Sequence, residues 1–145
     1  MRILDIPPTW TLLHMVLAWV FSQVWSFDLP LLSAVGWLII FAALIFAGFA
    51  VMVMARAKTT VIPGAEPTAL VTAGPFKLTR NPIYLADLFI VLGWTFVVGQ
   101  PLAAVLVYPL FRVLDRRFAE PEERKLEAAF GDGFKAYAGR VRRWL

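Results

Sequence analysis

The stretch "LPLLSAVGWLIIFAALIFAGFAVMVMA", residues 29–55, decides the fold because it contains no charged residue. A helix crosses the hydrocarbon core of a bilayer with about 20 predominantly apolar residues, so this stretch is long enough to span a membrane. The rest of the chain has a similar character: 60% of its 145 residues are hydrophobic, and its mean hydropathy is +0.72. We therefore predict an all-α integral membrane protein.

Three further apolar blocks bring the predicted number of transmembrane helices to about four. They cover residues 10–27, 82–99 and 101–117. The connections inside the first and second pairs of blocks are short, which predicts two helical hairpins in a single domain of residues 1–145. The last block contains Pro109, which predicts a kink or an end at the interface. In block 29–55, Gly36 and Gly48 are small residues that let helices approach closely.

The basic residues gather in two regions, a predicted loop at residues 56–81 and a predicted tail at residues 118–145. The connection after the first block contains Asp28 and no lysine or arginine, and the one after the third block is uncharged. Under the positive-inside rule, the loop and both termini face the cytosol. This predicts a multi-pass protein of a bacterial cytoplasmic membrane with a cytosolic active site. The net charge of +4 then indicates attraction to anionic lipid rather than to nucleic acid.

Cysteine and histidine, which often form metal-binding or catalytic sites, are absent or nearly absent. Cysteine is absent, and His14 is the only histidine. Disulfides, a cysteine nucleophile, a thiolate metal site and a multi-histidine metal site are therefore excluded. We expect no metal cofactor.

The tail begins with a run of alternating charges. Pro121, followed by Glu122 and Glu123, predicts the start of a helix with acidic residues in its first turn. Gly131 and Gly133 are predicted to break this helix, and a second short amphipathic helix follows. Such a charge run is usually a solvated helix face, but here it directly follows a membrane span. It can therefore fold back over the open end of the bundle and cover a cavity there.

The segment "TRNPIYLADLF", residues 79–89, opens the third block with polar groups that lipid does not require. Arg80 is explained as an interfacial anchor, and Pro82 as the first residue of a helix. Tyr84 and Asp87 lie three residues apart on one helical face. A carboxylate inside a span costs about 2.5–3.5 kcal/mol on insertion scales. Asp87 therefore either faces a cavity or partner, or is partly solvated because it lies close to the interface.

Two strings in this region resemble a known family. "LVTAGPFKLTRNPIYLA", residues 70–86, and "EERKLEAAFGDGFKAYAGRVRRWL", residues 122–145, are similar to the isoprenylcysteine carboxyl methyltransferases and to the wider group that includes the phospholipid N-methyltransferases. The resemblance implies an integral membrane enzyme that uses S-adenosylmethionine and methylates a lipophilic acceptor. In that family, the C-terminal helices cover a cytosolic cofactor pocket. Whether the acceptor is a carboxylate, a thiol or an amine stays open, as does the oligomeric state.

The resemblance also implies which residues contact the cofactor. By position they are Ala69, Leu70, Val71, Phe76, Asn81, Pro82, Tyr84 and Glu122. Asn81 stands where the family often has histidine, and an amide can still donate and accept hydrogen bonds there.

The expected catalytic residues are Arg117, Glu123 and Asp87. A family arginine that handles substrate corresponds to Phe118 here, so Arg117 or Arg116 would have to take its place. Asp87 is not a signature residue of the family.

Two other functions remain as alternatives. Membrane reductases of the sterol-reductase type have a related C-terminal arrangement and bind NADPH. A non-catalytic membrane scaffold would use the basic tail only as a clamp on the lipid surface. The bilayer and a lipophilic small molecule or lipid are the expected partners.

Overall fold

The computed structural model describes residues 5–27, 29–60, 62 and 64–145, and its regular elements there are all helical, which confirms the predicted all-α class. The elements are α1 (Pro7–Val24), α2 (Pro30–Arg56), the 3₁₀ turn η1 (Gly74–Lys77), α3 (Pro82–Val97), the 3₁₀ segment η2 (Pro101–Leu106), α4 (Val107–Leu114), the π-helical turn η3 (Asp115–Ala119), α5 (Glu120–Phe130) and α6 (Asp132–Ala138). Asp28, used above to orient the chain, lies outside the described residues.

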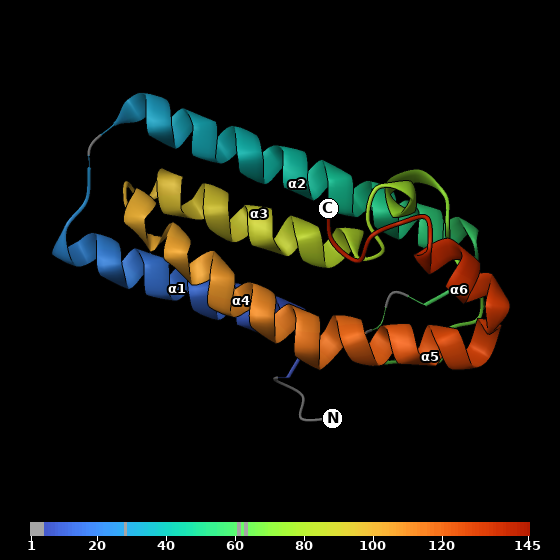
Figure 1. The fold of residues 1–145 in the computed structure, drawn as a ribbon. Coiled ribbons are helices and arrows are strands. Elements are labelled where there is room, and N and C mark those ends of the chain that lie inside the picture. The colour runs from blue at the N-terminus through green and yellow to red at the C-terminus, as the bar shows by residue number, and fades with distance from the viewer. Residues whose placement is uncertain (1–4, 28, 61, 63) are drawn as a thin grey trace.

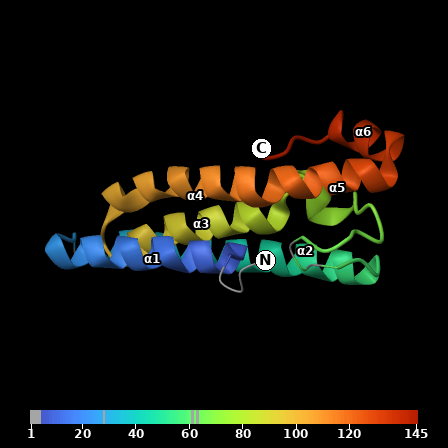
Figure 2. The same cartoon turned by 90° about the horizontal axis from the view of Figure 1, so that it is seen from below.

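Helix α3 is the central element of an elongated bundle. It packs most extensively on α2 and also contacts α1 and α4 (Figures 1 and 2). The first two helices are joined by a short connection, as predicted, but α3 lies between them. At this end of the bundle, the Phe27 amide donates a 2.7 Å hydrogen bond to the Gly99 carbonyl. The two short connections therefore lie side by side.

Glycine allows the close approach of α2 and α3. A Cβ built on Gly36 would lie 2.5 Å from the Gly93 carbonyl oxygen, and a Cβ on Gly93 would lie 2.7 Å from the Gly36 carbonyl oxygen. The predicted role of Gly36 in close helix contact is thus confirmed. The same prediction for Gly48 is wrong, because a Cβ there would meet nothing within 4 Å.

Helix α2 is long and apolar enough to cross a bilayer, and it is the one such helix among the residues that the structure describes. Most of its large side chains point outward: Leu31 is 80% exposed and Ile45 is 74% exposed. Helix α3 is apolar but shorter, with 16 residues.

The fourth block and the acidic tail form one continuous helical path. Segments η2, α4, η3 and α5 follow one another without a break. As predicted, Pro121 lies in the first turn of a helix, α5, together with Glu122 and Glu123, but this helix directly continues the path of η3. Inside an α-helix, proline lacks the N–H of the helical hydrogen bond, and its ring collides with the carbonyl four residues earlier. The wider π-helical turn directly before α5 accommodates the Pro121 ring. Pro109 lies in the first turn of α4, directly after the 3₁₀ segment η2.

The predicted break after α5 occurs at one glycine only. Gly131 has a positive φ of 49°, which glycine adopts without strain, and α6 begins at the next residue. Gly133, also predicted to break the helix, lies inside α6.

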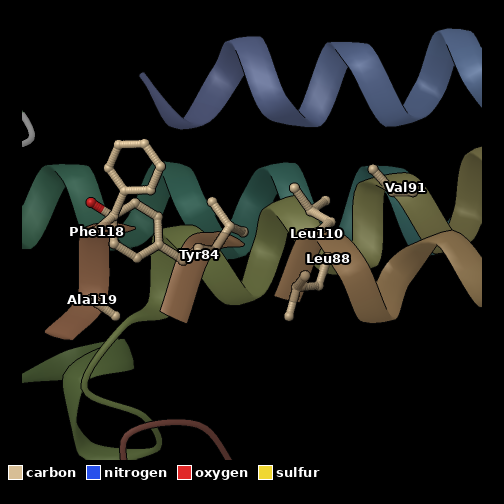
Figure 3. Close-up of a cluster of buried hydrophobic side chains, with 7 residues drawn as sticks. Tyr84, Leu88, Val91, Leu110, Phe118 and Ala119 are labelled. Carbon is tan, nitrogen blue, oxygen red and sulfur yellow. The ribbon is translucent and has the colours of Figure 1, made fainter. Parts of the chain in front are cut away.

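The main core joins α3 to the α4–η3–α5 path. Tyr84, Leu88 and Val91 of α3 pack on Leu110, Leu114, Phe118 and Ala119 (Figure 3). The Tyr84 and Phe118 rings lie 6.2 Å apart between centroids. Phe118 is therefore a core residue that holds the first turn of α3 against η3.

Candidate active site

A cavity of about 490 Å³ lies at the end of the bundle where α5, α6 and the 57–81 loop meet the first turns of α3. The start of α1 contributes Ile6, Pro7 and Pro8 to its wall. The residues expected to contact the cofactor line it without exception: Ala69, Leu70, Val71, Phe76, Asn81, Pro82, Tyr84 and Glu122. The expected catalytic residues Glu123 and Asp87 line it as well. The structure thus brings together residues from distant parts of the chain.

Arg80 is a largely buried clamp, and its interpretation as an interfacial anchor is wrong. Only 14% of its side-chain surface is exposed. Its Nε and Nη2 donate to the two oxygens of Glu123 at 3.0 and 3.2 Å. Its Nη1 donates to the carbonyls of Ala138 and Val141 at 3.1 and 3.0 Å. Arg80 therefore ties the entrance of α3 to α5 and to the residues after α6.

Glu123 binds a second arginine from the end of the chain. Arg143 donates from Nε and Nη2 to Glu123 Oε2 at 3.1 and 2.9 Å, and from Nη1 to Asp115 Oδ1 at 3.2 Å. The hydrogen bonds to Glu123, and then those to Asp115, raise the pKa of Arg143. Both oxygens of Glu123 are thus taken by guanidinium groups, with Arg80 on one side and Arg143 on the other.

The backbone after α6 completes this closure. The Arg143 carbonyl accepts hydrogen bonds from the Thr79 hydroxyl at 2.9 Å and from the Asn81 amide group at 3.2 Å. The Arg80 amide donates to the Arg142 carbonyl at 3.0 Å. Asn81 therefore uses one side-chain donor to hold the chain end, while its side chain still lines the cavity.

Glu122 faces the cavity and is held by one strong hydrogen bond. The Tyr84 hydroxyl donates to Glu122 Oε1 at 2.6 Å. Burial raises the pKa of the Glu122 carboxyl, and the bond from Tyr84 and the positive charge of Lys125 partly oppose this. This arrangement fixes an acceptor group that can bind an ammonium or a hydroxyl.

Tyr137 of α6 supports the part of the cavity wall that Phe76 forms. Its hydroxyl donates to the Phe76 carbonyl at 2.7 Å, and both residues are buried. Burial raises the pKa of Tyr137 to about 12, so its hydroxyl remains a donor at neutral pH. Tyr137 lines the cavity although the sequence did not single it out as a site residue. Its place on the apolar face of the last short helix was the available signal.

Residues 64–68 of the long loop form a lid over one side of the cavity. Lys125 of α5 donates to the Gly64 carbonyl at 2.5 Å and to Glu66 at 2.9 Å. Thr68 donates from its hydroxyl to the Lys58 carbonyl at 2.9 Å, which ties the returning part of the loop to the end of α2. The predicted loop is thus folded over the cavity, in the residues that the structure describes.

Comparison with known proteins gives the family. A model of the phospholipid methyltransferase family matches residues 31–133. The chain belongs to the phospholipid methyltransferase family. An uncharacterized protein of Haemophilus influenzae is 40% identical over 63 residues, which are 43% of this chain and the whole length of that protein. The match confirms the resemblance at the level of the family, whose members use S-adenosylmethionine and are associated with membranes.

One expected catalytic residue of this methyltransferase-family chain lies apart from the large cavity. Arg117 lines a smaller cavity of about 110 Å³ that shares Gly64, Glu122 and Lys125 with the large one. Its Nη2 bonds Asp5 at 2.6 Å, and its guanidinium lies 5.4 Å from the centroid of the Trp10 ring. Arg117 therefore fastens the start of α1 against η3.

Proposed function

We propose that this protein transfers a methyl group from S-adenosylmethionine to a lipophilic or membrane-associated acceptor. One observation carries the proposal: the eight residues that the family pattern assigns to the cofactor, from three separate segments of the chain, line one cavity. Membership of the phospholipid methyltransferase family supports a lipid acceptor.

The cavity suits the cofactor in size and in chemistry. Its volume lies within the usual 300–1,000 Å³ range of small-molecule sites. Phe76 and Leu70 offer apolar surface for an adenine ring, and Glu122 offers a carboxylate for an ammonium or for ribose hydroxyls. When bound, S-adenosylmethionine supplies a methyl group already activated on a sulfonium.

The protein then has to orient the reactants and exclude water. The Arg80–Glu123–Arg143 cluster holds the chain end and α5 over the cavity, and Lys125 holds the lid. In this proposal Glu123 is a positioning residue, because both its oxygens are bound by arginine. Arg117 acts in the same way by fixing the start of α1.

We also propose that α1, α2, α3 and the η2–α4 segment all cross the membrane, as one domain. They run side by side along the bundle (Figures 1 and 2). Helix α1 is apolar on its outer face, where Leu12 is 60% exposed and Phe21 is 51% exposed. The basic loop and tail gather at one end, which by the positive-inside rule is cytosolic.

Calorimetric titration of the full chain in nonionic detergent with S-adenosylhomocysteine tests the proposed activity. We expect binding, and at least a tenfold loss of affinity in Glu122→Gln because a charge-assisted hydrogen bond is lost. Glu127→Gln, on the exposed side of the same helix, is the matched control and keeps wild-type affinity. Binding of NADPH instead of S-adenosylhomocysteine would refute the proposal and favour a reductase.

A further inference from the structure

The large cavity has two covers, and they are held with unequal strength. One cover is α6 with the residues after it. Arg80 fastens this cover by donating to the carbonyls of Ala138 and Val141. Its guanidinium also binds Glu123, whose side chain is only 10% exposed and binds Arg143 as well. Separating these groups would leave charges of both signs unpaired and largely buried, so this cover is costly to open.

The other cover is the lid, residues 64–68, and one lysine of α5 holds it. Lys125 donates to the Gly64 carbonyl and to Glu66. The side chains of Lys125 and Glu66 are 36% and 81% exposed, and an ion pair as exposed as this favours the closed lid by about fivefold at most. Thr68, at the end of the lid, donates to the Lys58 carbonyl and keeps that end attached. The lid is therefore the cover that opens more easily.

The small cavity of about 110 Å³ lies against the same lid. It shares Gly64, Glu122 and Lys125 with the large cavity, so these residues stand between the two. Its lining also includes Asp5 and Arg117, and the Arg117 side chain is 50% exposed. The small cavity is thus reached from the protein surface.

The outer wall of the small cavity belongs to a part of the chain that the family model does not match. The match covers residues 31–133, and Asp5 precedes it. The Trp10 indole donates to Asp5 at 3.1 Å, and the Arg117 guanidinium lies over the Trp10 ring. These three residues hold one another without a contribution from the lid, so this wall stays in place when the lid moves.

We infer that the small cavity is the port through which the cofactor enters and its product leaves, and that Lys125 is the latch of this port. The inference rests on the proposed function and adds the route of exchange. Both S-adenosylmethionine and S-adenosylhomocysteine carry an ammonium and a carboxylate, which are costly to move past apolar surface without partners. Four of the seven residues that line the small cavity are charged: Asp5, Arg117, Glu122 and Lys125. When Lys125 releases the lid, the two cavities become one path from Glu122 to the surface.

Exchange rates of S-adenosylhomocysteine, measured on the full chain in nonionic detergent, test the latch. Glu66→Gln weakens the bond from Lys125, and Glu66 lines neither cavity, so the ligand contacts are kept. We expect the association and dissociation rates to rise together by about 2- to 5-fold, with the affinity unchanged within twofold, because the latch holds the lid in the empty and the loaded protein alike. Glu127→Gln is the matched control, since it removes another exposed ion pair, that with Lys135, and leaves both rates unchanged.

A reversible cross-link tests the lid directly. The chain contains no cysteine, so Glu66→Cys with Lys125→Cys supplies two thiols that a short bifunctional methanethiosulfonate joins and a reductant releases. Relative to the same variant before cross-linking, we expect uptake of S-adenosylhomocysteine by the empty protein and its release from the loaded protein to slow at least tenfold. The same cross-link in Glu127→Cys with Lys135→Cys joins α5 to α6 and leaves both rates within twofold.

The outcomes separate this inference from the proposed function. Exchange that the 66–125 cross-link leaves unchanged, or that the 127–135 cross-link blocks, overturns the port and leaves methyl transfer standing. A rise in the dissociation rate alone in Glu66→Gln overturns the latch, because the closed lid would then act on the bound state only. A wild type that does not bind S-adenosylhomocysteine overturns both the port and the proposed function.

Discussion

The crossing of α2 and α3 sets the position of the helix that carries the site, and a single methyl group tests it. In Gly36→Ala, the new Cβ would lie 2.5 Å from the Gly93 carbonyl oxygen and 2.9 Å from the Val97 amide nitrogen. Ordinary contact at such a position begins at 3.4 Å, so the two backbones must separate locally by about 0.9 Å. Neither obstacle is a flexible side-chain end, so rotamer changes cannot relieve the clash.

Overpacking of this kind costs about 1–3 kcal/mol. For a chain of this size, each 1 kcal/mol shifts the melting temperature by about 2–4 °C, which gives a fall of roughly 2–12 °C for Gly36→Ala. Gly48→Ala is the matched control on the same helix, because its Cβ meets nothing within 4 Å. The higher helix propensity of alanine, up to about 1 kcal/mol over glycine, leaves its melting temperature equal or slightly raised.

Thermal unfolding in one detergent, at one scan rate, measures both variants, since unfolding of membrane proteins is often irreversible. The expected change in melting temperature is negative for Gly36→Ala and zero or positive for Gly48→Ala, and this difference decides the test. If Gly36→Ala melts at or above the temperature of Gly48→Ala, the close crossing of α2 and α3 is not a feature of the folded protein.

Three further predictions concern the closure of the cavity. Glu123→Gln leaves Arg80 and Arg143 without their shared counter-ion. Breaking such a pair costs about 3–5 kcal/mol, so we expect a large drop in melting temperature. A drop below 2 °C would contradict the structural role of the Arg80–Glu123–Arg143 cluster. Tyr137→Phe removes the 2.7 Å bond to the Phe76 carbonyl and should cost about 1–3 kcal/mol in the same assay. Because the pKa of Tyr137 is about 12 in the folded state and near 10 when unfolded, the native state binds more protons between these values, so wild-type stability falls as pH rises from 10 to 12. Urea unfolding across that range should show a shallower fall in Tyr137→Phe, and an equal fall would refute this assignment.

The elements of the fold follow from local patterns. The helical segments could be predicted from the four apolar blocks, because a long apolar run is visible in the local sequence without knowledge of its contacts. The residues that line the cavity could be predicted from the family pattern, since residues such as Ala69 and Glu122 stand at positions of that pattern. The acidic first turn around Pro121 was predicted correctly, but its continuity with the preceding π-helical turn was not, because proline is tolerated both at a free helix start and after such a turn.

The long-range ion pairs could not be predicted. Arg80 and Glu123 are 43 residues apart, and nothing in the periodicity around either residue indicates the other. Arg80 therefore had the same local signature as an ordinary interfacial anchor. Arg117 likewise gave no sign that it binds Asp5, 112 residues earlier.

The pairing of Thr79, Arg80 and Asn81 with residues 142–143 has a consequence for biogenesis. These contacts join positions more than 60 residues apart, so they can form only after residues 142–143 have been synthesised. Helices α1 to α3 precede them in the chain and are synthesised first. During synthesis the nascent chain therefore passes through a stage in which α1 to α3 are complete and the cavity is still open on the side that residues 142–143 later close.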